Sequence, residues 1–343
     1  QSITGEYFDY DSDEYNTEID IQLIPDLSTL RSLPWARSPS LMVIHDLHYP
    51  NGQPVACAPR NVLKQILSRY EVKGWKPVVA PELEFYLTAR NTNPDMPVEP
   101  PIGRSGRQSV GRQSYSIMAI DEYENIIEDI YRFAEAQGLE IETLIQEGGA
   151  AQLEINMMHG DPLQMADNVF IFKRLIREAA LRHDCYATFM AKPVRDDPGS
   201  AMHIHQSVLN TKTGKNIFSD DEGNATEAFN HFIGGSQKYL MHAVPLLAPY
   251  VNSYRRITVE GQSAPSNLEW AADNRTTGLR VPHSGPEARR LENRVIGMDC
   301  NPYLAIATSL ACGLLGMQNK IDPRPEARNE VWEVDDCLPP NLN

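Results

Sequence analysis

The chain has 343 residues, of which 41% are hydrophobic and 22% are charged, and its formal net charge is −15. This is the composition of a globular protein that can bury a sizeable core in one large domain or two smaller ones. The acidic balance argues against nucleic acid as the main partner, because proteins that bind nucleic acid usually present a basic face.

The first part of the chain, residues 1–48, is predicted to form short strands separated by turns. Its clearest apolar runs are Ile19–Ile24 and Leu41–His45. Residues 49–59 are rich in proline and indicate a linker. From about residue 58 onward the pattern alternates between helices and short strands.

A helix is predicted over Arg60–Tyr70, followed by a strand through Val78–Leu87. Residues 91–114 lack apolar periodicity and are predicted to form an excursion loop. The next helix is expected to be capped by Asp121 and to end at Gly138. Its apolar residues fall on one face, namely Ile126, Ile127, Ile130 and Phe133.

Two later helices have strong start signals. Asp161-Pro162 begins one that runs to about His183, and Asn301-Pro302 begins another through Tyr303–Met317. The second is apolar nearly all round, so it is expected to be buried rather than amphipathic.

The five cysteines are scattered and odd in number, so we expect no disulfide framework and a reducing compartment. No apolar run reaches the length of about 18 residues that a membrane span requires. We therefore expect a cytoplasmic protein without a membrane partner. The chain opens without methionine and stops soon after Pro339-Pro340, and we expect residues to be missing at both ends.

Four predicted strands carry ligand-type residues two positions apart, and such residues share one face of a strand. The strands are Pro81–Leu87, Ala151–Met157, Ser200–Val208 and Arg289–Val295. Their polar faces hold Glu82, Glu84, Tyr86, Gln152, Glu154, Asn156, His203, His205, Ser207, Arg290, Glu292 and Arg294. One such strand usually has a solvated face, but four in one domain indicate the floor of an active site.

The residue types on these strands point to a particular chemistry. Several Glu with one or two His suit hard cations such as Mg²⁺ or Mn²⁺, and do not suit structural zinc. Arg beside such cations indicates phosphate, which Arg can hold bidentately, and the combination is typical of phosphoryl transfer. No GxxxxGK[ST] loop occurs, so ATP would not be held by a P-loop.

Further motifs occur together with these strands, in a fixed order along nearly the whole chain. They are Pro81–Phe85, Glu147–Glu154, Lys192-Pro193, Gly199–His205, Asn252–Arg256, Asn274–Pro282, Arg290–Arg294 and Asn301–Ala305. In this order they resemble the glutamine synthetase superfamily. The resemblance implies an α+β fold in which a curved antiparallel sheet lines the active site and helices pack outside it. Residues 1–48 would end a small β-grasp domain, and residues 49–343 would form the catalytic domain.

The resemblance also implies roles for individual residues. One metal site would use Glu84, Glu147 and Glu154, and a second would use Glu82, His203 and Glu292. The glutamate substrate would contact Gly199, His203, Arg256 and Arg294. His205, Ser207 and Arg290 would lie near ATP, with Arg275 and Arg280 on its phosphates. Catalysis itself is assigned to Arg256, Arg275 and Glu292. All six ligand positions and all five arginines are expected to line one cavity.

In the family, ATP phosphorylates the γ-carboxylate of glutamate, and an amine then attacks the acyl phosphate. The implied cofactors are ATP and two or more Mg²⁺ or Mn²⁺ ions, and the partners are small molecules. Family members assemble as stacked rings with active sites between subunits, so a double-ring dodecamer is expected here.

One departure from the family bears on the amine. Ammonia-using members carry a Glu where this chain has Ser263, and that carboxylate helps to bind ammonium. The Ser263 pattern resembles the γ-glutamylpolyamine synthetases and predicts a larger amine such as putrescine, which would also contact Ser263. Extra charges on a polyamine could meet Glu260 or Glu269. An apolar amine would need aromatic walls, for which Tyr254 and Trp270 are candidates.

A second departure is Pro198-Gly199-Ser200, where the family has Asn-Gly-Ser. Three other interpretations stay open from the sequence: a true glutamine synthetase that uses ammonia, an inactive ring protein, and a guanidino kinase. The filled ligand and arginine positions argue against the inactive protein. The Asn-Ser-Tyr-x-Arg loop at Asn252–Arg256 argues against the kinase, which would not need it.

Overall fold

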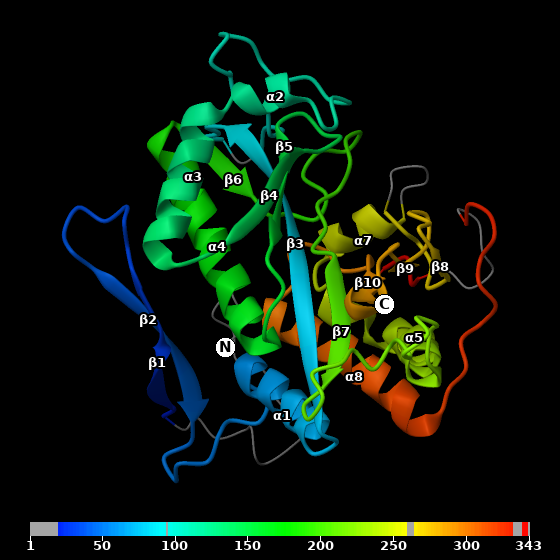
Figure 1. Cartoon of the computed structure of the whole chain (residues 1–343). Helices are drawn as coiled ribbons and strands as arrows, with labels where there is room; N and C mark the ends of the chain where they lie inside the picture. Colours follow the sequence, from blue (N-terminus) through cyan, green and yellow to red (C-terminus); the bar gives the residue numbers. More distant parts are fainter. Residues whose placement is uncertain (1–19, 94, 259–263, 332–337, 342–343) are drawn as a thin grey trace.

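The computed structural model describes residues 20–93, 95–258, 264–331 and 338–341. Its main feature is an eight-stranded sheet with the order β4-β5-β3-β7-β10-β9-β8, to which β6 is added by pairing with β3. Helices flank this sheet, and β3 runs through the middle of the molecule (Figure 1). The strands are β3 (Trp75–Ala89), β4 (Ile141–Gln146), β5 (Gln152–Met157), β6 (Cys185–Thr188), β7 (Ile204–Asn210), β8 (Trp270–Ala272), β9 (Leu279–Val281) and β10 (Leu291–Asn293).

All strand pairs in this sheet are antiparallel except β8 with β9, so the predicted α+β class is confirmed. The central strand β3 pairs with β7 along its first half and with β5 from Glu82 to Tyr86. Leu83 and Phe85 are fully buried in the core. Because alternate residues point to opposite faces, Glu82 and Glu84 lie on the other side of the sheet.

Several boundaries of the long helices lie where local signals predict them. The Asp161 side chain accepts hydrogen bonds from the first turn of α4 (Pro162–Arg182), and Asn301 does the same for α8 (Pro302–Asn319). Gly138 ends α3 (Glu124–Gln137) with a φ of 64°, a conformation that favours glycine. The starts of α4 and α8 and the end of α3 confirm the predictions, and the buried character of α8 is confirmed as well.

The predicted cap at Asp121 is wrong. Ser116 accepts a hydrogen bond from the backbone N–H of Ala119 and starts a separate short helix, α2 (Ile117–Asp121). Asp121 is therefore the last residue of α2, and its carboxylate forms an exposed ion pair with Arg104. Helix α3 then starts afresh at Glu124.

Helix α8 packs against α5 (Glu227–Leu240) and against α1 (Pro59–Glu71), in the lower part of the molecule as drawn in Figure 1. The contact with α5 is close because two glycines meet there. A Cβ added at Gly235 would lie 2.3 Å from the Cα of Gly316. After α5, the chain returns to the sheet through three short helices, η1 (Met241–Ala243), α6 (Val244–Leu247) and α7 (Val251–Ile257).

A separate two-stranded sheet is formed by β1 (Gln22–Ser32) and β2 (Leu41–His48). The nearly buried Arg60 of α1 joins it to the rest of the molecule. The guanidinium contacts Asp26 of β1 and Asp46 of β2 at 2.7 Å, and Asp167 of α4 at 2.9 Å. Both strands are longer than the apolar runs predicted, since their polar residues also find pairing partners.

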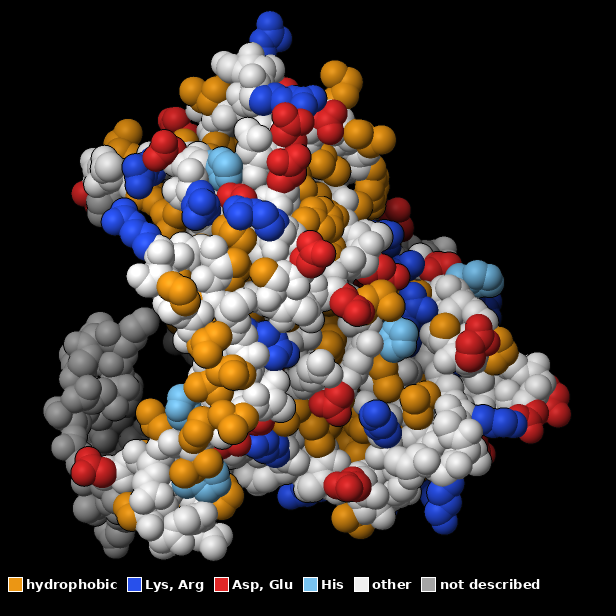
Figure 2. Space-filling model, turned by 60° about the vertical axis from the view of Figure 1, so that its left-hand side comes forward, with side chains coloured by type: hydrophobic (Ala, Val, Ile, Leu, Met, Phe, Trp, Pro, Cys, Tyr) orange, Lys and Arg blue, Asp and Glu red, His pale blue; other side chains and the backbone are white. Residues whose placement is uncertain are grey.

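On the part of the surface described in Figure 2, acidic and basic side chains are interspersed and form no continuous basic area. Among the described helices, none is both long and apolar enough to cross a membrane.

Candidate active site

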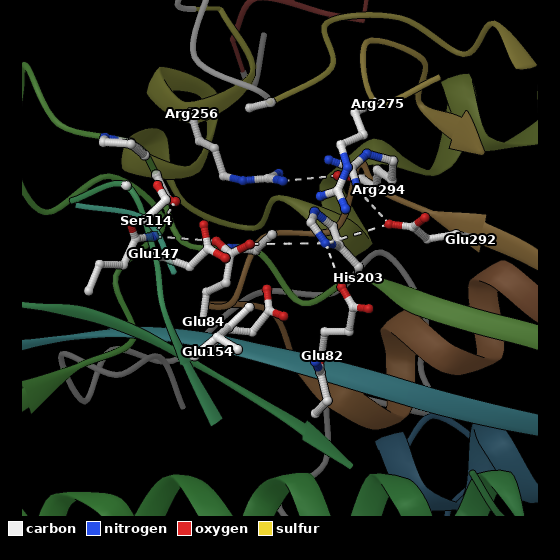
Figure 3. A pocket seen from close by; sticks show the side chains of 18 of the residues that line it. Glu82, Glu84, Ser114, Glu147, Glu154, His203, Arg256, Arg275, Glu292 and Arg294 are labelled. Carbon is white, nitrogen blue, oxygen red and sulfur yellow. Dashed lines mark hydrogen bonds and ion pairs between the residues drawn. The ribbon is translucent and has the colours of Figure 1, made fainter. Parts of the chain in front are cut away.

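The polar faces of the central strands line a cavity of about 380 Å³. All six predicted metal-ligand residues contribute to its lining, and Figure 3 shows their side chains pointing toward one another. They are Glu82, Glu84, Glu147, Glu154, His203 and Glu292. Gly199, Arg256, Arg275, Arg280 and Arg294 line the same cavity.

Strand register explains why these residues meet. Glu84 of β3 lies directly opposite Glu154 of β5, so their side chains share a face. Glu292 of β10 lies opposite His205 of β7, and the N–H of Glu82 bonds the carbonyl of His203 at 2.9 Å. Side chains from the four strands β3, β5, β7 and β10 are thereby brought to one place.

Glu82 accepts hydrogen bonds from two histidines. His203 Nδ1 lies 3.0 Å from Glu82 Oε2, and His205 Nε2 lies 2.8 Å from Glu82 Oε1. Burial alone would raise the pKa of Glu82, but these contacts outweigh it and hold this pKa below its usual range. Burial lowers the pKa of His203 to about 4, so its imidazole is neutral at pH 7, as a metal ligand must be.

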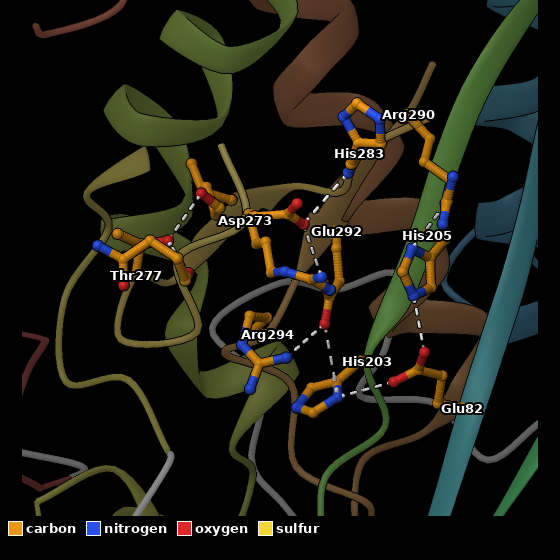
Figure 4. A network of polar contacts seen from close by, with 12 residues as sticks. Glu82, His203, His205, Asp273, Thr277, His283, Arg290, Glu292 and Arg294 are labelled. Carbon is orange, nitrogen blue, oxygen red and sulfur yellow. Dashed lines mark hydrogen bonds and ion pairs between the residues drawn. The ribbon is translucent and has the colours of Figure 1, made fainter. Parts of the chain in front are cut away.

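Glu292 is almost completely buried and holds two arginines (Figure 4). Its Oε2 accepts from Arg280 Nη1 at 2.8 Å, and its Oε1 accepts from Arg294 Nη1. Burial opposes ionisation of Glu292, but the charge of Arg294 leads the interactions that keep its pKa below the usual range. Two guanidinium groups are thus fixed at the cavity by one carboxylate.

Arg256 is held by backbone instead. Its two terminal nitrogens donate to the carbonyls of Val295 and Arg294, both at 2.9 Å. A Cβ on Gly199 would lie 2.7 Å from Arg256 Cγ, so only glycine leaves room for this side chain.

The expectation that Arg290 lines the same cavity is wrong. Arg290, His205 and Ser207 line a neighbouring cavity of about 720 Å³. Strand β10 begins only at Leu291, so the alternation of side chains along a strand does not fix the direction of the Arg290 side chain. Its Nε donates a hydrogen bond to His205 Nδ1 at 3.1 Å. Glu82 lines both cavities and forms part of the boundary between them.

The donor set fits divalent cations. Burial, and next the charge of Glu147, raises the pKa of Glu84 to about 8, and burial followed by the charge of Glu82 raises that of Glu154 to about 9. Bound cations would relieve this crowding of carboxylates. Ligand atoms lie within 4.8 Å of one another in two groups, Glu82 with His205 and Glu292, and Glu82 with Glu154 and His203. These groups differ from the two ligand sets that the resemblance implies, and those sets stay a prediction.

The raised pKa values predict how cations affect stability. Without cations, Glu84 and Glu154 hold protons in the folded state that they lose in the unfolded state above a pH of about 4.3. The stability that these protons provide is lost progressively as the pH rises from about 4.3 to about 8 to 9, where the folded state also releases them. We therefore expect the melting temperature in EDTA to fall over this range, and the gain from Mg²⁺ or Mn²⁺ to grow with pH.

Thermal unfolding at about pH 6 and about pH 8.5, with EDTA or excess metal, measures this difference. Glu84→Gln should flatten it, because an amide neither titrates nor binds a cation as a carboxylate does. An equal metal effect at both pH values would show that these carboxylates do not hold the ion.

Four uncharged residues that sequence reasoning did not select also line the first cavity, namely Ser114, Tyr115, Ile145 and Ala264. Figure 3 shows Ser114 beside Glu147. Tyr115 has a φ of 64°, which is uncommon outside glycine, and its N–H donates to the carbonyl of Gln146 at 2.8 Å. Residues 91–114 have no apolar periodicity, so the sequence gave no indication that Tyr115 lines the cavity.

Two predicted aromatic walls are absent from the described lining. Tyr254 is buried in the core, and Trp270 donates its indole N–H to the carbonyl of Arg324. Glu269 forms an ion pair with Arg324 at 2.9 Å and does not line the cavity either. Ser263 and Glu260 lie outside the described residues.

Comparison with known proteins gives a consistent result. The sequence profile of the glutamine synthetase catalytic domain matches residues 56–341. A glutamate–isopropylamine ligase from Pseudomonas sp. is 35% identical over 321 residues, covering 92% of this chain and 68% of the relative. The glutamine synthetase of Pyrococcus horikoshii is 35% identical over 332 residues, covering 94% and 71%.

The gamma-glutamylputrescine synthetase PuuA of Escherichia coli (strain K12) is 36% identical over 286 residues, covering 82% of this chain and 60% of the relative. Among solved structures, a GmaS/ADP complex superimposes with a TM-score of 0.83 at 29% identity. That match covers 96% of this chain and 76% of the GmaS chain.

Proposed function

This chain belongs to the glutamine synthetase family of ATP-dependent glutamate–amine ligases, and we propose that its amine is larger than ammonia and carries a second amino group, as putrescine does. The proposed reaction transfers the γ-phosphoryl group of ATP to the glutamate γ-carboxylate. The amine nitrogen then attacks the γ-glutamyl phosphate, forms the C–N bond and releases phosphate.

The geometry supports a division of labour around the first cavity. Arg256 and Arg294 are held in place and would bind the glutamate carboxylates, with Gly199 leaving room for the substrate. Arg275 and Arg280 would neutralise the charge that develops on the phosphoryl oxygens. The carboxylates and His203 would hold divalent ions, which when bound would supply positive charge against the phosphates.

The second cavity would receive the nucleotide beyond the metals. His205, Ser207 and Arg290 line it, and Arg290 is fixed by its bond to His205. The proposed phosphoryl transfer therefore runs from the larger cavity toward the smaller one, past Glu82.

The observation that carries the proposed amine is Ser263, which stands where ammonia-using relatives have Glu. Ammonium is small and cationic, and its site needs a carboxylate beside it, whereas serine is neutral and shorter. The uncharged residues Ser114, Tyr115 and Ile145 line the first cavity, with Ser114 beside Glu147 in Figure 3, and would leave space for a carbon chain on the amine. Burial raises the pKa of Glu147, and this carboxylate would accept a proton from the attacking nitrogen.

The alternative is a true glutamine synthetase. The Pyrococcus horikoshii enzyme is as similar to this chain as the isopropylamine ligase is, with 35% identity in each case. The two functions differ in one measurable property, which is the amine that supports phosphate release.

We expect phosphate release with glutamate and ATP to be fastest with putrescine or spermidine, slower with isopropylamine, and slowest with ammonia. Steady-state kinetics with each amine measure kcat/KM directly. Ser263→Glu should shift the preference toward ammonia by roughly tenfold or more, because it restores a carboxylate for ammonium. Ser263→Ala is the matched control, since it adds no charge. Efficient use of ammonia at millimolar levels by the unmodified enzyme would instead identify a glutamine synthetase.

We also propose that the boundary near residue 48 separates the end of a β-grasp domain from the catalytic domain, and that the protein forms a double-ring dodecamer. Exposed apolar side chains on the β1–β2 sheet, including Leu23, Leu27 and Leu41, support a partner surface there. Light scattering on the purified protein would give the number of subunits.

A further inference from the structure

After α8, the chain runs back along the sheet as an extended segment, here named the C-terminal strap and defined as Arg324–Val331. It rises beside β8 in Figure 1. Its first half is bonded to β8: Trp270 Nε1 donates to the carbonyl of Arg324 at 2.7 Å, and the N–H of Ala327 donates to the carbonyl of Trp270 at 3.0 Å. The strap is therefore fixed along the edge of the sheet.

The second half of the strap reaches the loop that carries Arg275. Asn274 Nδ2 donates to the carbonyl of Asn329 at 2.8 Å, and the N–H of Val331 donates to Thr276 Oγ1, also at 2.8 Å. Both neighbours of Arg275 in the sequence are thus bonded to the strap. Asn267 closes the arrangement, because its Nδ2 donates to the carbonyls of Thr276 and Val331.

Arg275 differs from the other arginines of the first cavity. Arg256 is held by backbone carbonyls, and Arg280 and Arg294 are held by Glu292. Arg275 makes no hydrogen bond to the part of the chain that the structure describes, although its side chain points into the cavity (Figure 3). The position of this guanidinium therefore depends on the backbone of residues 274–276.

From this arrangement we propose that the C-terminal strap is a positioning element for Arg275. The strap fixes the backbone on both sides of Arg275. The Arg275 side chain can then move to contact a phosphoryl group, while the position of its Cα stays fixed. A small displacement would matter, because misplacement by about 1 Å can cost a reaction on the order of 100-fold. The inference rests on the proposed role of Arg275 in phosphoryl transfer.

The hydrogen bond between Val331 and Thr276 can be removed from either end. Thr276→Val removes the acceptor with little change in shape, together with the bond that Thr276 Oγ1 donates to Asn274 Oδ1, whereas Val331→Pro removes only the donor. Each is expected to lower kcat roughly tenfold, with the KM for glutamate unchanged within about twofold, since glutamate would be held by other residues. Thr276→Ser keeps the hydroxyl and should restore kcat.

A double-mutant cycle tests whether the strap acts through Arg275. In an Arg275→Ala background, Thr276→Val should have no further effect on kcat. An equal loss in both backgrounds, or normal kcat in Thr276→Val beside a slow Arg275→Ala, would overturn the inference and leave the proposed function intact. Normal kcat in Arg275→Ala would reject the proposed role of that residue and the inference with it. Thermal unfolding under assay conditions completes the test, and a drop in the folded fraction large enough to explain the lost activity would overturn the inference.

Discussion

Arg275→Ala is expected to lower kcat by roughly 100-fold or more, the scale seen when a contact made only in the transition state is removed. The side chain is exposed to the first cavity, and within the described residues no carboxylate is hydrogen-bonded to it. Its charge is therefore available to the phosphoryl group. The measurement is steady-state phosphate release at saturating glutamate, ATP and amine.

Two further variants make the result specific. Arg275→Lys keeps the charge but loses the planar fork of donors, so it should recover only part of the rate. Arg90→Ala removes an exposed arginine that pairs with Asp184 and does not line the cavity, and kcat should not change. A near-normal rate in Arg275→Ala would mean that other groups neutralise the charge on the phosphoryl group.

Glu292→Ala is expected to lower the free energy of unfolding by roughly 3–5 kcal/mol, the cost of leaving a buried charge uncompensated. The carboxylate is 1% exposed and is bonded to both Arg280 and Arg294. Removing it leaves two guanidinium groups at the cavity with no shared counter-charge. Urea denaturation, followed by fluorescence, gives the difference in stability.

Glu292→Gln is the matched variant, because it keeps the shape and one acceptor oxygen but not the charge. Its destabilisation should be smaller, while activity should be lost in both variants if Glu292 also binds a cation. Glu287→Ala, an exposed substitution nearby, should stay within about 0.5 kcal/mol of the parent. A Glu292→Ala protein as stable as that control would show that the two arginines are compensated by other groups.

Local signals were sufficient for much of the fold. The helix starts at Asp161 and Asn301 and the stop at Gly138 depend on hydrogen bonds within a few residues, so they can be predicted from sequence. The cap at Asp121 could not, because Ser116 starts a separate short helix that ends at Asp121. Ser116 and Asp121 are both capping residue types, and their order in the sequence does not indicate which one the chain uses.

The cavity was predictable where residues lie inside regular strands. Period-two alternation brings Glu82 and Glu84 to one face, and antiparallel register adds Glu154. Arg290 was assigned to the wrong cavity, because β10 is only three residues long and the alternation of side chains cannot be extended beyond its ends. Tyr115 shows a second limit, since its place depends on a backbone conformation that the sequence does not signal.

Glu82 belongs to the lining of both cavities and to both groups of ligand atoms. A ligand in one cavity that changes the orientation of this carboxylate must also change the lining of the other cavity. Occupancy of the two cavities is therefore linked through Glu82, and Asn156 also lines both of them. Suppose that a cation in the smaller cavity changes the affinity of the larger cavity for its ligand by some factor. Thermodynamic reciprocity then requires that this ligand changes the affinity of the smaller cavity for the cation by the same factor.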